Sequence, residues 1–151
     1  MTAIPLITVD IGNARMKLAS FPSESGDGVP EPDSLLTLHG ALPAWGLLRP
    51  WLDELGHGQL HWFIGSVNRP AATKLLDWLR ANRPADAATM LAAGDLPLEV
   101  RLERPDMVGI DRLLDALAAK HLRQANRPAV VVDVGSAITI DLIDADGAFL
   151  G

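Results

Sequence analysis

A pattern that occurs twice constrains the fold of this 151-residue chain more than any other feature. Near the start, the β-branched, apolar run 6–11 ends in Asp10-Ile11-Gly12, and near the end, the run 130–134 ends in Asp133-Val134-Gly135. Each copy is followed by a few polar residues and a further apolar run. Each copy therefore predicts a β-hairpin with a short turn, so we expect the same hairpin at both ends of the chain.

Between the two hairpins, apolar residues recur with the periods of both strands and helices. Strands are predicted at 34–39, 61–64, 88–91, 129–134 and 138–143, and helices at 47–55, 71–79 and 108–122. An opening hairpin and third strand followed by alternating helices and strands predict a mixed α/β sheet. The run 129–134 is almost wholly apolar, which is typical of a strand that a sheet buries on both faces.

Composition narrows the function classes. The chain has 13 basic and 19 acidic residues, a net charge of -6, and no cysteine. This charge argues against general binding to nucleic acid or to anionic membranes. The lack of cysteine excludes disulfides, thiolate zinc sites and thiol nucleophiles, and no apolar run approaches the ~20 residues of a membrane span. We therefore expect a soluble, cytoplasmic protein that uses neither nucleic acid nor a membrane as a partner.

The Asp-x-Gly turns suit the chemistry of metal-bound phosphate. The carboxylate of Asp10 can hold Mg²⁺, Gly12 lets backbone N–H groups approach phosphate oxygens, and Lys17 can add a positive charge. A single copy is equally well explained as favourable hairpin-turn chemistry. Two copies, at Asp10 and Asp133, favour a clamp that holds one polyphosphate from both sides.

A third cluster, Gly109-Ile110-Asp111-Arg112, begins the helix predicted at 108–122. Asp111 falls in the first turn, where the helix dipole favours an ionised carboxylate that can accept the proton of a substrate hydroxyl. Arg112 can bind a carboxylate or phosphate through two parallel hydrogen bonds. The alternative is that Asp111 only stabilises the helix start and that Arg112 is solvated. Three further acidic residues lack the spacing of a calcium loop and are attributed to the polar surface of the second hairpin, namely Asp141, Asp144 and Asp146.

Taken together, the three motifs resemble those of the type III pantothenate kinases, which belong to the actin-like, Hsp70-like ATPase superfamily. That family carries Asp-x-Gly-Asn-Thr, Gly-x-Asp-Arg and Asp-x-Gly-Thr-Ala-Thr-Thr, in this order. The matching strings here are Asp10-Ile11-Gly12-Asn13-Ala14, Gly109-Ile110-Asp111-Arg112 and Asp133-Val134-Gly135-Ser136-Ala137-Ile138-Thr139. The resemblance implies a mixed five-stranded, RNase H-like α/β sheet with flanking helices over 1–127. Residues 128–151 would form the opening hairpin of a second such lobe.

The resemblance also implies an activity, in which the γ-phosphoryl group of ATP is transferred to pantothenate. The product would be 4'-phosphopantothenate, at the start of coenzyme A biosynthesis. Asp111 would be the catalytic base, and Gly109, Ile110, Asp111 and Arg112 would bind pantothenate. The ATP site would comprise Asp10, Ile11, Gly12, Asn13, Ala14, Arg15, Met16, Lys17 and Ser136. Asp10 would lie near Mg²⁺, and Asp133 would hold K⁺ or NH₄⁺.

The chain departs from the family pattern at three positions. Ala14 and Ile138 stand where the family has residues with hydroxyl groups, and Met107 stands where Arg is common. These changes weaken the predicted nucleotide site more than the predicted base. A non-catalytic accessory relative and another small-molecule kinase or ATPase of the superfamily are therefore alternatives, although the substrate motif 109–112 argues against the latter. We expect a homodimer at full length, and weak ATP binding with slow or no turnover for residues 1–151 alone.

Overall fold

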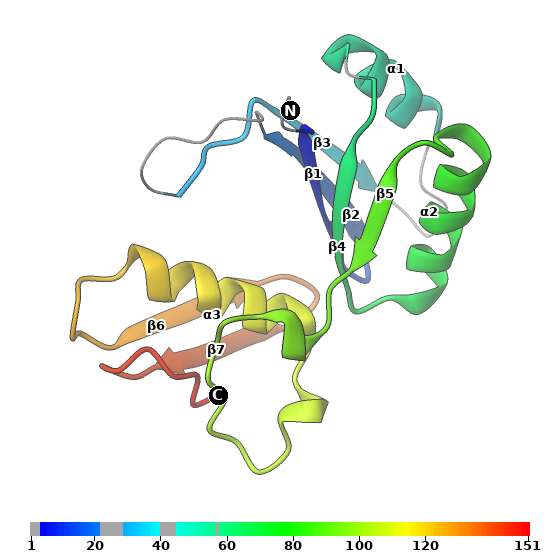
Figure 1. Cartoon of the computed structure of the whole chain (residues 1–151). Helices are drawn as coiled ribbons and strands as arrows, with labels where there is room; N and C mark the ends of the chain where they lie inside the picture. Colours follow the sequence, from blue (N-terminus) through cyan, green and yellow to red (C-terminus); the bar gives the residue numbers. More distant parts are fainter. Residues whose placement is uncertain (1–3, 22–28, 40–44, 57) are drawn as a thin grey trace. The chain divides into compact units, whose positions relative to one another are not determined.

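The computed structural model describes residues 4–21, 29–39, 45–56 and 58–151. The chain divides into two compact units, Met1–Leu91 and Ala92–Gly151, which are described separately below (Figure 1). Among the described helices, none has the length and apolar character needed to cross a membrane. The division into lobes at 1–127 and 128–151 stays a prediction.

The first unit is built on one mixed sheet in the order β3-β2-β1-β4-β5. Its strands are β1 (Leu6–Ile11), β2 (Arg15–Phe21), β3 (Ser34–His39), β4 (His61–Ser66) and β5 (Ala87–Met90). The strands β1, β2 and β3 form an antiparallel meander, whereas β4 runs parallel to both β1 and β5. Two helices complete the unit, α1 (Trp45–Leu55) before β4 and α2 (Arg69–Asn82) between β4 and β5.

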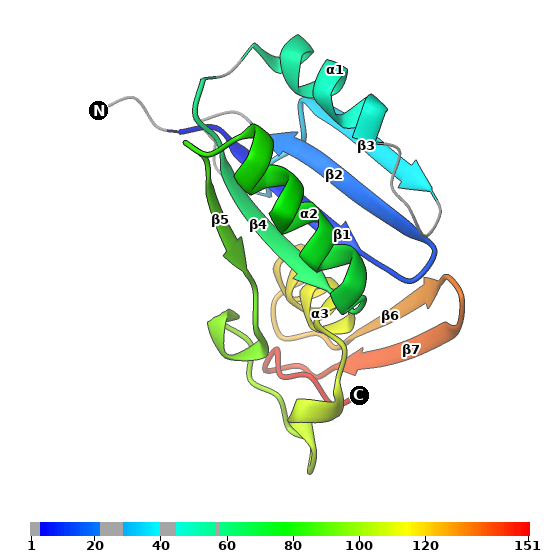
Figure 2. The same cartoon turned by 90° about the vertical axis from the view of Figure 1, so that its right-hand side faces the viewer.

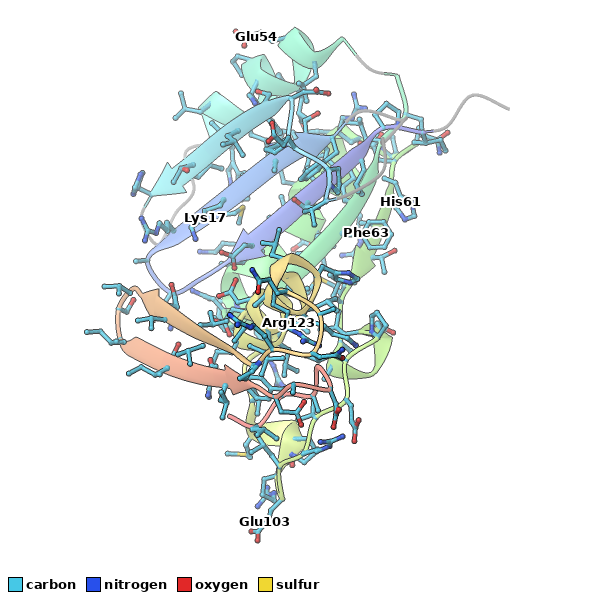
Figure 3. All side chains as sticks on the ribbon, turned by 90° about the vertical axis from the view of Figure 1, so that its left-hand side faces the viewer. Lys17, Glu54, His61, Phe63, Glu103 and Arg123 are labelled. Atoms are coloured by element: carbon cyan, nitrogen blue, oxygen red, sulfur yellow. The ribbon has the colours of Figure 1, made fainter. Side chains whose placement is uncertain are left out.

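Both helices cover the same face of this sheet (Figure 2). Alternation along β1 sends Ile7, Val9 and Ile11 to that face, where they pack in one core with the apolar stripes of α1 and α2. The opposite face carries the polar members of the strands, and Figure 3 shows Lys17, His61 and Phe63 on it. Asp10, the predicted site residue of β1, therefore lies on the face of this sheet that α1 and α2 leave uncovered.

The second unit consists of a helix packed on a hairpin. Its elements are the short 3₁₀ helices η1 (Ala93–Asp95) and η2 (Pro105–Met107), helix α3 (Ile110–Leu122), and the antiparallel strands β6 (Ala129–Val134) and β7 (Ile138–Ile143). Leu113 and Ala116 of α3 pack against Ile143 and Phe149. The end of the chain returns alongside β7, where the N–H of Leu150 donates to the carbonyl of Leu142 at 2.9 Å.

The hairpin of the second unit has one covered and one uncovered face. The face away from α3 is wholly apolar and consists of Val130, Val132, Val134, Ile138, Ile140 and Leu142. Its three valines are between 57% and 66% exposed. The expectation that 129–134 is buried on both faces is therefore wrong for the described residues, because α3 covers only the other face of the hairpin.

Candidate functional site

The first Asp-x-Gly turn connects β1 to β2, as predicted. Asp10 lies directly opposite Lys17, and the Nζ of Lys17 is 3.3 Å from Oδ2 of Asp10, with both side chains about half exposed. The N–H of Gly12 donates to the carbonyl of Arg15 at 3.0 Å and closes the turn. Among the described residues, the N–H groups of Asn13 and Ala14 have no backbone acceptor, so the turn offers two donors to a ligand.

The predicted ATP-binding residues of this hairpin contribute unequally. Ile11 and Met16 are paired across the strands and have buried side chains that face α1 and α2. They can therefore supply only backbone groups to a ligand. Arg15 and Lys17 alternate with Met16 along β2 and are exposed on the opposite face, with Lys17 beside Asp10. The charged side chains of the hairpin thus lie together on one face.

The glycines in the two Asp-x-Gly turns are not required by the backbone. Neither Gly12 nor Gly135 has a positive φ. A Cβ atom built on Gly12 would lie 3.5 Å from its nearest neighbour, the carbonyl oxygen of Arg15, and one built on Gly135 would lie 3.7 Å from Oδ2 of Asp133. Both distances are ordinary van der Waals contacts. A methyl group would therefore fit at either turn, whereas Gly147 has a φ of 92° and a Cβ there would lie 2.9 Å from Nη2 of Arg123.

The second Asp-x-Gly turn connects β6 to β7. Asp133 lies opposite Thr139, and the N–H of Gly135 donates to the carbonyl of Ala137 at 3.0 Å. Ser136 is exposed within the turn. The Oγ1 atom of Thr139 is buried and has no hydrogen-bond partner among the described residues. The turn thus places a buried hydroxyl without a hydrogen-bond partner next to an exposed carboxylate.

The Gly-x-Asp-Arg sequence begins α3, as predicted. Gly109 is the N-cap residue, and because it has no side chain it cannot cap the helix itself. Asp111 falls in the first turn, where its Oδ1 accepts the N–H of Arg112 at 2.9 Å. Asp111 is partly exposed. Its carboxylate thus lies in the first turn of α3, at the positive end of the helix dipole.

Arg112 is held by a buried carboxylate that the sequence reasoning missed. Nε of Arg112 donates to Oδ2 of Asp141 at 3.0 Å, and Nη2 donates to the other oxygen of the same group. The side chain of Asp141 is only 2% exposed. The prediction that Asp141 belongs to the polar surface of the second hairpin is therefore wrong. The sequence does contain a signal for this burial. Asp141 lies two residues before Ile143, and alternation along β7 sends both side chains to the covered face.

This pairing affects the electrostatics of the site. The hydrogen bonds that Arg112 donates to Asp141 raise the pKa of Arg112, so its guanidinium carries a full positive charge at any physiological pH. The Cζ of Arg112 also lies 5.8 Å from the centre of the Phe149 ring, at cation–π distance. Within residues 92–151, these contacts join the start of α3 to the strand that follows the second Asp-x-Gly turn. The predicted approach of Asp10 to Asp133 involves both units and stays a prediction.

The residues present suit the cations that the family pattern implies. Mg²⁺ is commonly bound by one or two carboxylates together with substrate phosphates and waters, which a single carboxylate such as Asp10 can satisfy. A monovalent cation prefers oxygen ligands, which the exposed carboxylate of Asp133 could supply, with the hydroxyl of Thr139 on the opposite strand. The described residues contain no group of three or more His, Asp or Glu side chains that could hold a metal ion.

Comparison with known proteins places the chain in a family. A family model described as type III pantothenate kinase matches residues 6–151. The chain belongs to the type III pantothenate kinase family. A type III pantothenate kinase of Stenotrophomonas maltophilia strain K279a is 33% identical over 143 residues, which cover 94% of this chain and 54% of the relative. That of Rhodospirillum centenum is 32% identical over 158 residues, covering 97% of this chain and 56% of the relative.

The type III pantothenate kinases that match along nearly the whole chain are about twice its length, so the chain spans about half of each. A solved structure of a Ppx/GppA family member from Aquifex aeolicus matches 95% of this chain and 48% of its own, with a TM-score of 0.50 and 10% identity. At this identity the likeness concerns the fold alone. It confirms the predicted class, a mixed five-stranded α/β sheet with flanking helices of the actin-like ATPase type.

Proposed function

We propose that this chain contributes to the ATP-dependent phosphorylation of pantothenate to 4'-phosphopantothenate in coenzyme A biosynthesis. The observation that carries the proposal is the start of α3, where Asp111 and Arg112 stand side by side with their carboxylate and guanidinium fixed by hydrogen bonds. An acidic residue beside a fixed cation matches a substrate that has both a hydroxyl to be deprotonated and a carboxylate to be bound. Membership of the family supports the same activity.

In the proposed reaction, Asp111 accepts the proton of the primary hydroxyl of pantothenate. Arg112 binds the carboxylate of the substrate through N–H groups that Asp141 does not use. Gly109 and Ile110 would contribute backbone groups. The protein's contribution is thus positioning and charge neutralisation, which is typical of phosphoryl transfer.

The ATP phosphates are proposed to lie against the two Asp-x-Gly turns. The first turn would contribute the N–H groups of Asn13 and Ala14 and the charge of Lys17, and the second would contribute Ser136. The two glycines support this assignment, because neither their φ angles nor the space around them requires a glycine for folding. Asp10 would hold Mg²⁺, and Asp133 with Thr139 would hold K⁺ or NH₄⁺. These cations would neutralise the charge of the transferring phosphoryl group.

The uncovered apolar face of the β6–β7 hairpin supports the proposed division into two lobes. Apolar side chains on one face of a sheet are normally covered by helices. We propose that 128–151 is the opening hairpin of a second lobe whose remaining elements cover this face, and that the longer protein is a cytoplasmic homodimer. Residues 1–151 alone would then bind ATP weakly and turn over slowly or not at all.

Ala14 favours one alternative, a non-catalytic accessory relative, since this turn lacks the hydroxyl that the family pattern places there. Calorimetric titration of the purified chain distinguishes kinase function from this non-catalytic alternative. Kinase function predicts binding of pantothenate, and binding of Mg·ATP that strengthens when K⁺ is present. A chain that binds neither pantothenate nor Mg·ATP, with or without K⁺, would contradict the kinase assignment.

A further inference from the structure

The protein itself uses only part of the hydrogen-bonding capacity of the Arg112 guanidinium. An arginine offers two edges for a carboxylate, one formed by Nε and Nη2 and the other by Nη1 and Nη2. Asp141 occupies the first edge, through Nε and Nη2. Among the described residues, Nη1 has no acceptor. The second edge is therefore available to a ligand, and a ligand that uses it does not need to displace Asp141.

The surroundings fix the direction in which the free edge points. Asp141 is almost completely buried on the covered face of β7, and the ring of Phe149, which is fully buried, lies against the guanidinium. The side chain of Arg112 itself remains about a third exposed. A long, flexible arginine that is held on one edge and packed against a ring loses most of its rotamer freedom before a ligand arrives. Less ordering entropy is then lost on binding.

Asp141 also connects the two motifs of this unit. It lies on β7 two residues after Thr139, the residue opposite Asp133, and it binds the residue that follows Asp111 on α3. The carboxylate of Asp141 thus sets the position of the helix start relative to the strand that continues from the second Asp-x-Gly turn. No other ion pair among the described residues connects α3 to the hairpin strands.

We propose that Asp141 is a positioning residue for substrate binding, which holds Arg112 so that its Nη1–Nη2 edge receives the carboxylate of pantothenate. The inference rests on the proposed function, because it takes the substrate from there. Asp141 touches no substrate in this arrangement and acts only through Arg112. Without the Asp141 carboxylate, the guanidinium would be free to rotate, and the selectivity for an acidic substrate would fall.

The first unit provides a matched control for the loss of a buried ion pair. Asp86, which is also 2% exposed, accepts hydrogen bonds from Nε of Arg83 at 2.9 Å and from Nη2 at 3.0 Å. This pair belongs to the loop between α2 and β5, which contains none of the proposed site residues. If the role of Asp141 is purely structural, Asp141→Asn should, like Asp86→Asn, lower Tm without changing the selectivity for an acidic ligand.

The test measures the affinity of the chain for pantothenate and for pantothenol, its analogue with a primary alcohol in place of the carboxylate. Calorimetry should give a lower Kd for pantothenate than for pantothenol in the native chain. Asp141→Asn should weaken pantothenate binding by about tenfold and leave pantothenol binding almost unchanged, because one charged hydrogen-bond network is lost. Asp86→Asn, which also changes the acceptors for Leu60 N–H and Trp62 Nε1–H, should lower Tm without changing either Kd, and Asp141→Glu should restore part of the selectivity.

Each failure has a distinct meaning. A native chain that binds neither compound overturns the proposed function, and this inference falls with it. Two results overturn the positioning role alone. One is a pantothenate affinity that Asp141→Asn leaves unchanged, and the other is an equal loss of affinity for pantothenate and pantothenol. If Asp141→Asn does not fold, ¹⁵N NMR of the arginine side chains in the native chain decides. Pantothenate should then shift the Nη signals of Arg112 and leave its Nε–H bonded, and loss of the Nε–H bond overturns the proposal.

Discussion

Nε of Arg112 lies 3.0 Å from Oδ2 of Asp141, a residue 29 positions further along the chain whose side chain is 2% exposed. The pair joins the first turn of α3 to the middle of β7. A buried carboxylate is stable only while it is paired, since its desolvation is otherwise uncompensated. The stability of the second unit and the geometry of its candidate site therefore depend on the same two hydrogen bonds.

The first prediction concerns the cost of breaking this pair. Arg112→Met leaves Asp141 buried without its cation and should lower the free energy of unfolding by about 3 kcal/mol. The double variant Arg112→Met/Asp141→Leu should recover part of this loss, because it removes both charges. Urea denaturation followed by circular dichroism measures both effects. An unfolding free energy that Arg112→Met leaves unchanged would show that the pair contributes nothing.

The second prediction separates glycines that serve a ligand from those that serve the fold. Gly12→Ala and Gly135→Ala should leave Tm within about 1–2 °C of the native value, and each should weaken the binding of Mg·ATP at least severalfold. Gly147→Ala is the control. It should lower Tm clearly, because φ there is 92°, a backbone conformation that residues with a side chain rarely adopt. Unchanged nucleotide affinity in both turn variants would argue against phosphate binding at these turns.

The third prediction tests the proposed base. Asp111→Asn should abolish phosphoryl transfer in the full-length protein and spare the binding of Mg·ATP, since the amide keeps the shape of the side chain but accepts no proton. A coupled assay of ADP release measures the transfer, and calorimetry measures the binding. Retained turnover would count against Asp111 as the base.

The fourth prediction is a pH dependence at the turn after β7. Oδ1 of Asp144 accepts the N–H of Ala148 at 2.9 Å, and this bond, aided by the nearby Arg101, holds the pKa of Asp144 below its ordinary value of 3.8. Because the folded state binds this proton less readily, the stabilisation is present above pH 3.8 and is lost as the pH falls through the lowered pKa. Thermal unfolding between about pH 5 and 2 should show this loss, and Asp144→Asn should reduce the slope.

The fifth prediction compares two adjacent valines on opposite faces of β6. Val132 is 57% exposed on the uncovered face, whereas Val131 is partly buried against α3. Val132→Lys should reduce the binding of the dye ANS and self-association with little change in Tm, because it interrupts an exposed apolar patch. Val131→Lys should lower Tm. Equal effects of both substitutions would mean that the uncovered face is packed in solution.

The sequence predicted the elements of the fold well, because their signals are local. The strands at 34–39, 129–134 and 138–143 have the predicted bounds, and each helix was found with an error of at most two or three residues at either end. The helix predicted at 47–55 extends from Trp45 to Leu55, although Pro50 lies inside it. Hydrophobic periodicity and turn residues suffice for such assignments, since neither depends on distant parts of the chain.

The candidate site could be predicted only in part. The Asp-x-Gly turns and the first turn of α3 follow from short motifs, and the structure places them where the motifs imply. The partner of Arg112 does not follow, because Asp141 is 29 residues away and the contact depends on how α3 packs on β7. The uncovered face of β6 also could not be foreseen, since the apolar residues of a strand do not reveal which helices cover it.

The two turn glycines have a consequence for the history of this family. Because the fold tolerates a methyl group at either position, selection for folding alone would not retain Gly12 or Gly135. A descendant that lost the need for nucleotide would therefore accumulate larger residues at these turns long before its hydrophobic core changed. Under the proposed phosphate binding at these turns, the residues at these two positions would indicate which relatives still bind the nucleotide, whatever the state of their hydrophobic cores.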